Sequence, residues 1–283
     1  MTERKYIDFF VSDVHSYYHP LKEALDAAGF DLTNPLHRLI ICGDIFDRGP
    51  DTVTVYQFVN SIPKDRRILI RGNHDLLYYE LLKKSFPHTY DFSNGTVDTF
   101  CQIAGVDPCE LSLQYYKKQY YRQQRTPDTA YIQFKLKDTW DKVVAAVWKS
   151  EITAWLFSDE WVNYYESDDI IAVHSFIPLE MDWRNASAES WERAMWGCPW
   201  KQFKAGFFKE EAARGKTLIV GHWHAEEFHA VFEGKHGDYE LYFGPNLVAL
   251  DGMTAMTYKV PVLKISPEGC FDKYSNRLGD VLR

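Results

Sequence analysis

Five short apolar runs along the chain have the composition of buried β-strands, since each is rich in isoleucine, valine, leucine or phenylalanine. They span residues 6–11, 38–42, 67–70, 170–173 and 217–220. Helix-like segments at residues 21–28 and 52–62 separate the first three runs. These segments are short enough for right-handed β-α-β crossovers. The early part of the chain therefore predicts a parallel sheet.

A second group of apolar runs, at residues 239–243, 247–250 and 258–265, follows near the end of the chain. Gly244-Pro245-Asn246 and Asp251-Gly252 join them, and both connections resemble hairpin turns. A second, more antiparallel sheet packed on the first would bury both inner faces and leave helices outside. We therefore expect an α/β fold with four layers, an αββα sandwich of two mixed β-sheets flanked by helices.

The segment between these groups, residues 86–168, combines helical spacing of apolar residues with many tyrosines and tryptophans. Proline and glycine interrupt it repeatedly, which predicts several short helices. The interruptions are Pro87, Asn94-Gly95, Gly105, Pro108 and Pro127. We expect residues 1–283 to form a single domain, with residues 86–168 as a helical insertion or cap.

The composition is that of a soluble globular protein, with 46% hydrophobic and 25% charged residues. The first apolar run begins at residue 6, and no stretch approaches the roughly 18 uninterrupted apolar residues of a membrane span. We therefore expect a cytoplasmic protein with no membrane partner. The five cysteines are scattered without a Cys-x-x-Cys pair, which predicts reduced thiols.

The net charge of −8 and the pI near 5.7 argue against general nucleic-acid binding, which requires a surplus of basic groups. Part of this acidity would belong to a site where bound cations offset clustered carboxylates. Asp251 is one of the carboxylates expected near such cations.

Metal-ligand residues follow each of the five apolar runs. They form the segments Asp13-Val14-His15, Gly43-Asp44-Ile45-Phe46-Asp47-Arg48-Gly49, Gly72-Asn73-His74-Asp75, Val173-His174 and Gly221-His222-Trp223-His224. A side chain at the carboxyl end of a buried strand projects into the crevice where α/β folds bind ligands. Five such ends can converge, and the residue types indicate a two-metal phosphoesterase.

The first two segments supply carboxylates and an arginine. Asp13 and His15 are two residues apart and would share one face of a strand, although alone they could equally form a polar turn. Asp44 directly follows a strand, and its two oxygens could bridge two cations. Arg48 could bind two phosphate oxygens as a fork, or form a surface ion pair with Asp47.

The remaining segments supply neutral donors. Asn73 offers a carbonyl oxygen, and His74 could be a ligand or a general acid; we favour the acid, with Asp47 or Asp75 as its carboxylate partner. A lone histidine such as His174 is more often structural than a ligand. His222 and His224 are a stronger signal, because two imidazoles at one strand end can reach the same site.

Together these motifs resemble the calcineurin-like metallophosphoesterase superfamily, in particular its phosphoprotein-phosphatase (serine/threonine phosphatase-like) branch. That branch carries Asp-x-His, Gly-Asp-x-x-Asp-Arg-Gly and Gly-Asn-His-Glu/Asp in this order, and all three are intact here. The resemblance covers residues 1–85 and resumes over residues 152–252. It implies the metallophosphoesterase fold and a centre of two divalent or trivalent transition-metal ions.

The resemblance also implies roles for individual residues. One metal would be bound by Asp13, His15 and Asp44, and the other by Asp44, Asn73, His174 and His222. Arg48 and Asn73 would contact phosphate, and His74 would be the acid with Asp47 as its partner.

Two features depart from the phosphatase pattern, and one residue that the pattern expects has two candidates. His224 corresponds to a ligand of the first metal in phosphodiesterase branches. A further phosphate-binding arginine has two candidates, Arg184 and Arg193, of which we favour Arg193. Ser175-Phe176 replaces a small pair, so Phe176 could narrow the cleft.

We expect an enzyme that hydrolyses phosphomonoesters, such as phosphoserine, phosphothreonine or small phosphoesters, by direct attack of a metal-bound hydroxide. The Asp-Arg-Gly triplet favours this function. The alternative is a nucleotide pyrophosphohydrolase resembling the symmetrical dinucleoside tetraphosphate hydrolases, which share Gly-Asn-His-Asp-Leu and Gly-His-Trp followed two residues on by Ala. A phosphodiesterase is also possible.

Manganese is the expected metal, although oxygen and imidazole ligands also suit iron, zinc, cobalt and nickel. The expected partners are a phosphorylated protein, a small phosphoester or a nucleotide as substrate. A third hypothesis is a non-catalytic scaffold that uses the middle segment to bind a partner. The basic stretch at residues 117–125 could then be a docking surface, although a solvated helix face explains it as well.

Overall fold

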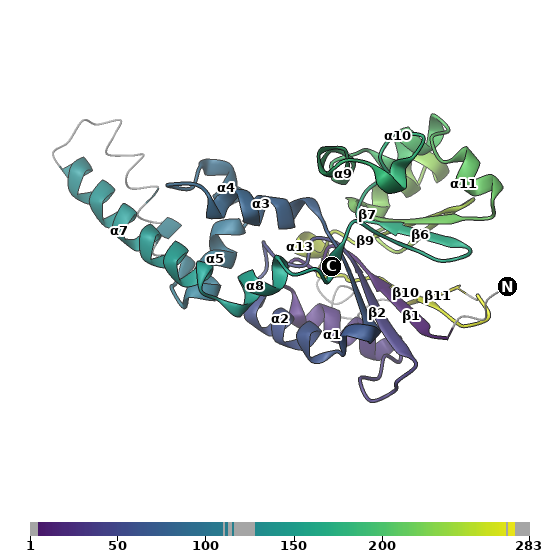
Figure 1. Cartoon of the computed structure of the whole chain (residues 1–283), viewed down its shortest axis with the longest axis horizontal. Coiled ribbons are helices and arrows are strands. Elements are labelled where there is room, and N and C mark those ends of the chain that lie inside the picture. Colours follow the sequence, from purple (N-terminus) through teal and green to yellow (C-terminus); the bar gives the residue numbers. More distant parts are fainter. Residues whose placement is uncertain (1–4, 110, 113–114, 116–127, 270, 275–283) are drawn as a thin grey trace.

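The computed structural model describes residues 5–109, 111–112, 115, 128–269 and 271–274 (Figure 1). The basic stretch at residues 117–125 lies outside the described residues.

The first sheet has six strands in the order β11-β10-β1-β2-β3-β4. Its strands are β1 (Ile7–Val11), β2 (His37–Cys42), β3 (Arg67–Ile70), β4 (Trp161–Val162), β10 (Val262–Ile265) and β11 (Phe271–Tyr274). Strands β1, β2 and β3 pair in parallel, as the β-α-β pattern predicted, and β4 adds a further parallel strand, whereas β10 and β11 are antiparallel. The carboxyl ends of β1, β2 and β3 therefore lie at one edge.

The second sheet has five strands in the order β5-β6-β7-β9-β8. They are β5 (Tyr164–Glu166), β6 (Ile170–Val173), β7 (Thr217–His224), β8 (Tyr242–Gly244) and β9 (Leu247–Asp251). Strands β6, β7 and β9 are parallel, and only the outer strands β5 and β8 are antiparallel. This sheet is thus less antiparallel than the turn-like connections suggested.

The apolar run at residues 258–265 does not continue the second sheet. Its strand β10 pairs with β1 in the first sheet, where Leu263 and Ile265 join Phe10 in the core between the sheets. Val262, on the opposite face, joins the outer core with Phe9. Successive side chains of a strand point to opposite faces of its sheet. Beside β1, the apolar side chains on both faces of β10 are buried, one set in each core, which explains the placement.

The two sheets and their flanking helices form the four predicted layers (Figure 1). Helices α1 (Tyr18–Ala27) and α2 (Thr52–Ser61) bury apolar residues against the outer face of the first sheet. Helices α9 (Ala188–Met195) and α10 (Pro199–Lys204) contribute to the outer core of the second sheet. The αββα sandwich predicted from the sequence is confirmed.

The middle of the chain contains several short helices and one long one. They are α3 (Asn73–Leu82), α4 (Thr89–Ser93), α5 (Thr96–Ala104), α7 (Asp128–Trp148) and α8 (Glu151–Leu156). Gly95 and Gly105 flank α5 with φ of +82° and +68°, which explains why the helices stop there. Figure 1 shows α7 extending away from the two sheets. Residues 161–166, predicted as part of this helical insertion, instead form β4 and β5 of the two sheets.

The remaining helical segments are short. They are α11 (Lys209–Ala213), α12 (Ala225–Phe228), α13 (Thr254–Thr257), two 3₁₀ turns at Lys64–Arg66 and Trp183–Asn185, and a π-helical turn at His229–Glu233. Among the described residues, no helix is both long and apolar enough to cross a membrane. The four described cysteines, Cys42, Cys101, Cys109 and Cys198, are free thiols, as predicted.

Candidate metal centre

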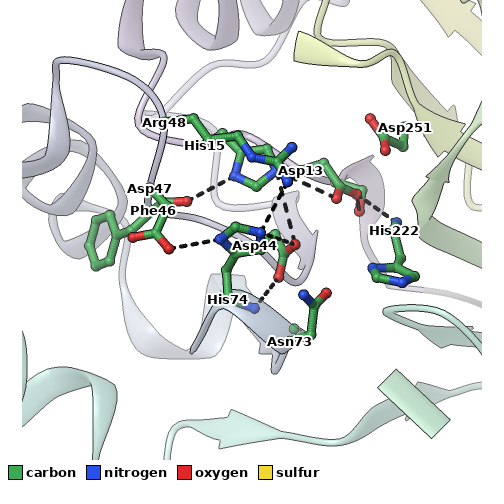
Figure 2. Close-up of polar contacts among 12 residues, drawn as sticks. Asp13, His15, Asp44, Phe46, Asp47, Arg48, Asn73, His74, His222 and Asp251 are labelled. Carbon is green, nitrogen blue, oxygen red and sulfur yellow. Dashed lines mark hydrogen bonds and ion pairs between the residues drawn. The ribbon is translucent and has the colours of Figure 1, made fainter. Parts of the chain in front are cut away.

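The carboxyl ends of β1, β2, β3, β6 and β7 converge between the two sheets. Figure 2 shows the polar side chains that follow β1, β2, β3 and β7 gathered in one region. Potential ligand atoms of His15, Asp44 and His74 lie within 4.8 Å of one another. Those of Asp44, His174 and His222 form a second such group. Asp44 belongs to both groups, which is the position expected of a carboxylate that bridges two cations.

Asp13 is fixed beside these groups by two donors. The Ser12 hydroxyl donates to its Oδ2, and so does the backbone N–H of His222, at 2.9 Å. Its Oδ1 lies 3.9 Å from His15 Nε2. The first and the last metal-ligand segments of the chain are therefore joined directly at this carboxylate.

Two histidines each have one ring nitrogen hydrogen-bonded to a backbone carbonyl. The pairs are His15 Nδ1 with the Phe46 carbonyl at 2.9 Å and His174 Nδ1 with the Cys42 carbonyl at 2.8 Å. A carbonyl can only accept, so each Nδ1 donates and a neutral ring presents a lone pair at Nε2. His174 Nε2 then faces Asn73 Oδ1, another acceptor, at 2.8 Å. Acceptors that face each other in this way fit a bound cation.

The backbone of these loops is held in an uncommon conformation. Of the ten non-glycine residues with positive φ in the described part of the chain, seven belong to the strand-end loops, with φ between 50° and 75°. They are Asp13, His15, Ser16, Asp44, Asp47, Arg48 and His222. Each residue in this backbone conformation costs roughly 1–3 kcal/mol of folding free energy, and contacts with the surrounding structure must offset that cost. Backbone hydrogen bonds between the first two loops, such as His15 N–H to the Asp44 carbonyl at 3.0 Å, supply that support.

Two glycines allow the loops to approach this closely. A Cβ on Gly72 would lie 2.1 Å from Asp44 Oδ1, and one on Gly221 would lie 2.4 Å from Asp13 Oδ2. Any side chain at either position would displace a candidate ligand. The glycines seen in the sequence motifs therefore serve the geometry of the carboxylates.

Burial and mutual repulsion disfavour the ionised form of two carboxylates of this cluster, Asp13 and Asp251. Burial raises the pKa of Asp13 to about 6, with Asp44 adding to the effect. Burial, together with Asp13, also raises the pKa of Asp251 far above its usual value. Asp44 differs: burial alone would raise its pKa, but the surrounding imidazoles, His174 first, lower it. A cation would stabilise the ionised form of all three.

His224 and Asp251 lie together at the edge of the cluster. His224 Nε2 is 3.8 Å from Asp251 Oδ2, and His224 lines the same cavity as His222. Burial lowers the pKa of His224, with Arg48 adding to the effect, which favours a neutral imidazole. The structure therefore brings His224 to the centre as a neutral donor.

His74 pairs with Asp47 beside the metal-ligand residues. Its Nδ1 lies 2.7 Å from Asp47 Oδ2, and Arg48 Nη2 lies 3.1 Å from its Nε2 (Figure 2). Burial would lower the pKa of His74, but Asp44 and Asp47 raise it above its usual value. The structure thus selects Asp47, rather than Asp75, as the carboxylate partner of His74. Gly72 N–H donates to Asp75 instead, at 2.7 Å.

Helix α5 and the turn that precedes it pack directly behind this pair. Thr96 and Thr99 donate their hydroxyl protons to Asp47 at 2.7 and 2.8 Å. Gln102 Nε2 donates to the Gly49 carbonyl at 2.9 Å, and a Cβ on Gly95 would lie 2.3 Å from Arg48 N. These residues were not identified from the sequence, because they carry no motif of their own. The insertion therefore positions the Asp47-Arg48-Gly49 loop.

The cluster lines a cavity of about 390 Å³ that also contains Arg48 and His74. Asn94, Trp196 and Trp223 complete its wall, and none of the three was predicted to have a role. The exposed Trp196 directly follows α9.

Neither candidate for the additional phosphate-binding arginine lines this cavity. The Arg193 side chain is 64% exposed and donates to Glu189 and Ser190 on its own helix. Arg184 pairs with Glu166 and Glu211. The face of α9 that carries Arg193 lines a different cavity, so Arg193 is not retained as a phosphate ligand. Phe176 is buried in the core of the second sheet and does not line the cleft.

The family model for calcineurin-like phosphoesterases matches residues 9–226, which contain all the strand-end motifs. The chain belongs to the calcineurin-like phosphoesterase family. Members of this family are dinuclear metal enzymes that hydrolyse phosphoesters, and the donor set described above fits two cations.

Two curated relatives carry the same name. The symmetrical bis(5'-nucleosyl)-tetraphosphatase of Aeromonas hydrophila is 40% identical over 67 residues, 24% of this chain and 23% of the relative. That of Legionella pneumophila is 31% identical over 112 residues, 40% of this chain and 38% of the relative. The matched segments thus span well under half of these relatives.

Among solved structures, a cold-active protein tyrosine phosphatase is similar in fold. Its TM-score is 0.51 at 13% identity, with 95% of this chain and 78% of that chain covered. This similarity supports the calcineurin-like phosphoesterase fold of the chain and, at such low identity, nothing finer.

Proposed function

We propose that this calcineurin-like phosphoesterase hydrolyses a phosphoanhydride bond in a dinucleoside polyphosphate. We choose this substrate because the chain is similar to relatives named symmetrical bis(5'-nucleosyl)-tetraphosphatases. The geometry supports the chemistry, because a metal-ligand cluster, an arginine and a paired histidine line one cavity. The function expected first from the sequence, hydrolysis of phosphomonoesters, becomes the second candidate.

Two cations would be bound by the residues that the structure brings together. Asp13, His15 and Asp44 would bind one, and Asp44, Asn73, His174 and His222 the other. His224 faces the same cavity and is available as a further donor to the first. When bound, the cations polarise water and offset phosphate charge. We expect manganese, since this mixture of oxygen and imidazole donors suits it.

The chain's own residues would then bind and orient the phosphate. The planar guanidinium of Arg48 can donate to two phosphate oxygens at once. Because Arg48 Nη2 lies 3.1 Å from His74 Nε2, a phosphate bound by Arg48 would lie within reach of that nitrogen. His74, oriented through Nδ1 by Asp47, would give a proton from Nε2 to the leaving oxygen.

Phosphomonoesters are the second candidate, and the His74–Asp47 pair favours them. An alkoxide leaving group is strongly basic and needs a proton, whereas a phosphate leaving group needs one far less. The pKa of His74 is raised by Asp44 and Asp47, so the imidazolium form is stabilised near neutral pH. An acid of this kind is most useful for phosphoserine, phosphothreonine or small alkyl phosphates.

The test is turnover after chelation and addition of manganese, on diadenosine tetraphosphate, para-nitrophenyl phosphate, its bis-ester and a phosphothreonine peptide. We expect diadenosine tetraphosphate to be preferred by at least about tenfold in kcat/KM, a difference of roughly 1.4 kcal/mol. Adenosine 5'-diphosphate as the sole nucleotide product would mark symmetrical cleavage. Asp44→Asn protein, purified in parallel, controls for contaminating phosphatases.

Each other outcome favours a different function. Preference for the monoester and the peptide would favour the second candidate, and preference for the bis-ester would indicate a phosphodiesterase. No turnover by protein that contains two bound metals would favour the scaffold hypothesis.

A further inference from the structure

Trp196 lies at the edge of the cavity that contains the metal-ligand residues. It is 51% exposed, and its ring centroid is 5.8 Å from that of His222, with the two planes at 87°. A single exposed apolar side chain needs no explanation by itself, and Trp148 on α7 is also 51% exposed. Trp196 differs from Trp148 because it shares a cavity with Arg48 and His74.

The position of Trp196 is fixed by the elements that carry the imidazoles. The carbonyl of the next residue, Gly197, accepts hydrogen bonds from Ser175 Oγ at 2.7 Å and from Trp223 Nε1 at 2.6 Å. Ser175 follows His174, and Trp223 follows His222. The backbone beside Trp196 is therefore fixed relative to the candidate metal ligands, and the edge-to-face contact with His222 places the half-exposed indole next to one of them.

We propose that Trp196 forms a nucleobase subsite, in which its indole stacks on the base of a nucleotide whose phosphate is bound at Arg48. This inference rests on the proposed function and deepens it by assigning the group that recognises the nucleoside. A nucleotide joins a phosphate to a flat aromatic base, and the cavity offers an arginine and an indole in the same wall. Stacking uses the π-face that every base has, so purine and pyrimidine nucleotides would both bind.

The first experiment measures binding without turnover. Adenosine 5'-(α,β-methylene)diphosphate and methylenediphosphonate carry the same hydrolysis-resistant phosphonate group, and only the first has a nucleoside. Calorimetric titration of the manganese-loaded protein should show that Trp196→Ala weakens the nucleotide analogue about tenfold. The affinity for methylenediphosphonate should stay within about twofold.

Trp148→Ala is the matched control, because it removes an equally exposed tryptophan outside the cavity. It should change neither affinity. Trp196→Phe keeps an aromatic face and should retain most of the affinity for the nucleotide analogue. Trp196→Leu keeps apolar packing without that face, so it should bind the nucleotide analogue about tenfold more weakly than the wild type does. This variant tests the subsite even if Trp196→Ala folds poorly. Melting curves of all four variants establish that they are folded.

An equal loss of affinity for both ligands in Trp196→Ala and Trp196→Leu, or no loss for either ligand, would overturn the subsite. Fluorescence gives an independent reading, since stacking on an indole quenches its emission. The nucleotide analogue should quench wild-type emission more than that of Trp196→Phe, and equal quenching would contradict the proposal.

Turnover distinguishes failure of the subsite from failure of the proposed function. With diadenosine tetraphosphate, Trp196→Ala should raise KM about tenfold and change kcat little. Unchanged kinetics in an enzyme that cleaves this substrate would overturn the subsite alone. Absence of cleavage by the wild type, with Trp196-dependent binding of the nucleotide analogue, would overturn the function and leave the subsite standing.

Discussion

The segments at the strand ends and helix α5 contribute to the centre in different ways. The segments after β1, β2 and β3 carry ionisable groups such as Asp13, Asp44 and His74, and the backbone after β1 and β2 is strained. Helix α5 contributes the hydroxyl groups of Thr96 and Thr99 and the amide group of Gln102, which hydrogen-bond to the loop after β2. The strand-end segments therefore contain the candidate ligands and the candidate acid, whereas α5 supports their geometry. We expect mutations in the two regions to have effects of different size and kind.

The largest effect is expected from Asp44→Asn, because Asp44 belongs to both groups of candidate ligands. Loss of this carboxylate should abolish binding of both cations and lower kcat/KM by more than about 10³-fold, since cations contribute several kcal/mol to phosphoryl transfer. Metal content by mass spectrometry and turnover measure this. Asp26→Asn, at the exposed Lys22–Asp26 ion pair of α1, is the control. Two bound metals in Asp44→Asn would exclude Asp44 as a bridging ligand.

His74→Asn separates acid catalysis from metal binding within the same loops. We expect kcat on alkyl phosphates to fall about 10²–10⁴-fold while metal content stays at the wild-type level. Aryl phosphates should be affected less, because their leaving groups need a proton less. His74 also lies near His15 and Asp44, so loss of a metal from this variant would identify it as a ligand instead.

Thr99→Val tests the contribution of α5, because it removes the two hydrogen bonds that the Thr99 hydroxyl makes with Asp47 and leaves the candidate ligands and His74 unchanged. We expect kcat to fall about tenfold, as is usual for residues that orient catalytic groups. Asp47 helps to raise the pKa of His74, so a looser Asp47 should move the basic limb of the kcat profile to lower pH. Thr89→Val removes a hydroxyl that bonds to Tyr115 elsewhere in the insertion and should leave kcat and its pH profile unchanged. Equal effects of the two variants would mean that the insertion acts only through stability.

The smallest effect is expected far from the centre, at Glu211. This carboxylate accepts hydrogen bonds from Arg184 at 2.8 Å and Trp183 at 3.1 Å, and Arg184 lowers its pKa. A lowered pKa in the folded state means that Glu211 stabilises the protein above its unfolded pKa of about 4.3, and that this stability is lost as the pH falls through the folded value.

Thermal melting of Glu211→Gln should show a loss of about 1–2 kcal/mol in the free energy of unfolding at pH 7. The difference from wild type should shrink as the pH falls below about 4.3. Glu210→Gln, at an exposed neighbouring position, should change stability little at any pH. A difference that is independent of pH would show that charge on Glu211 does not contribute.

The strands and the glycine breaks could be predicted because local sequence determines them. The apolar runs at residues 67–70 and 170–173 coincide with β3 and β6, and Gly95 and Gly105 flank α5 as the turn residues suggested. The metal-ligand residues were found because carboxylates and imidazoles at strand ends are unusual.

Other features depend on contacts between distant segments, which no local pattern encodes. The pairing of β10 with β1 buries apolar residues of β10 in two different cores, one on each face of the first sheet. No local pattern marked Thr99 or Trp196, because a threonine on a helix or a tryptophan at a helix end is ordinary until its neighbours in the fold are known. Arg193 was assigned to phosphate by its type, but its direction follows from which face of α9 is buried.

The hydrogen bond from His222 N–H to Asp13 joins residues that are 209 positions apart in the chain. Closing so long a loop is entropically costly and belongs late in a folding pathway. The full donor set therefore exists only after the last part of β7 has paired. Metal ions would then bind a finished fold and stabilise it by mass action, so added manganese should slow unfolding and leave early folding steps unchanged.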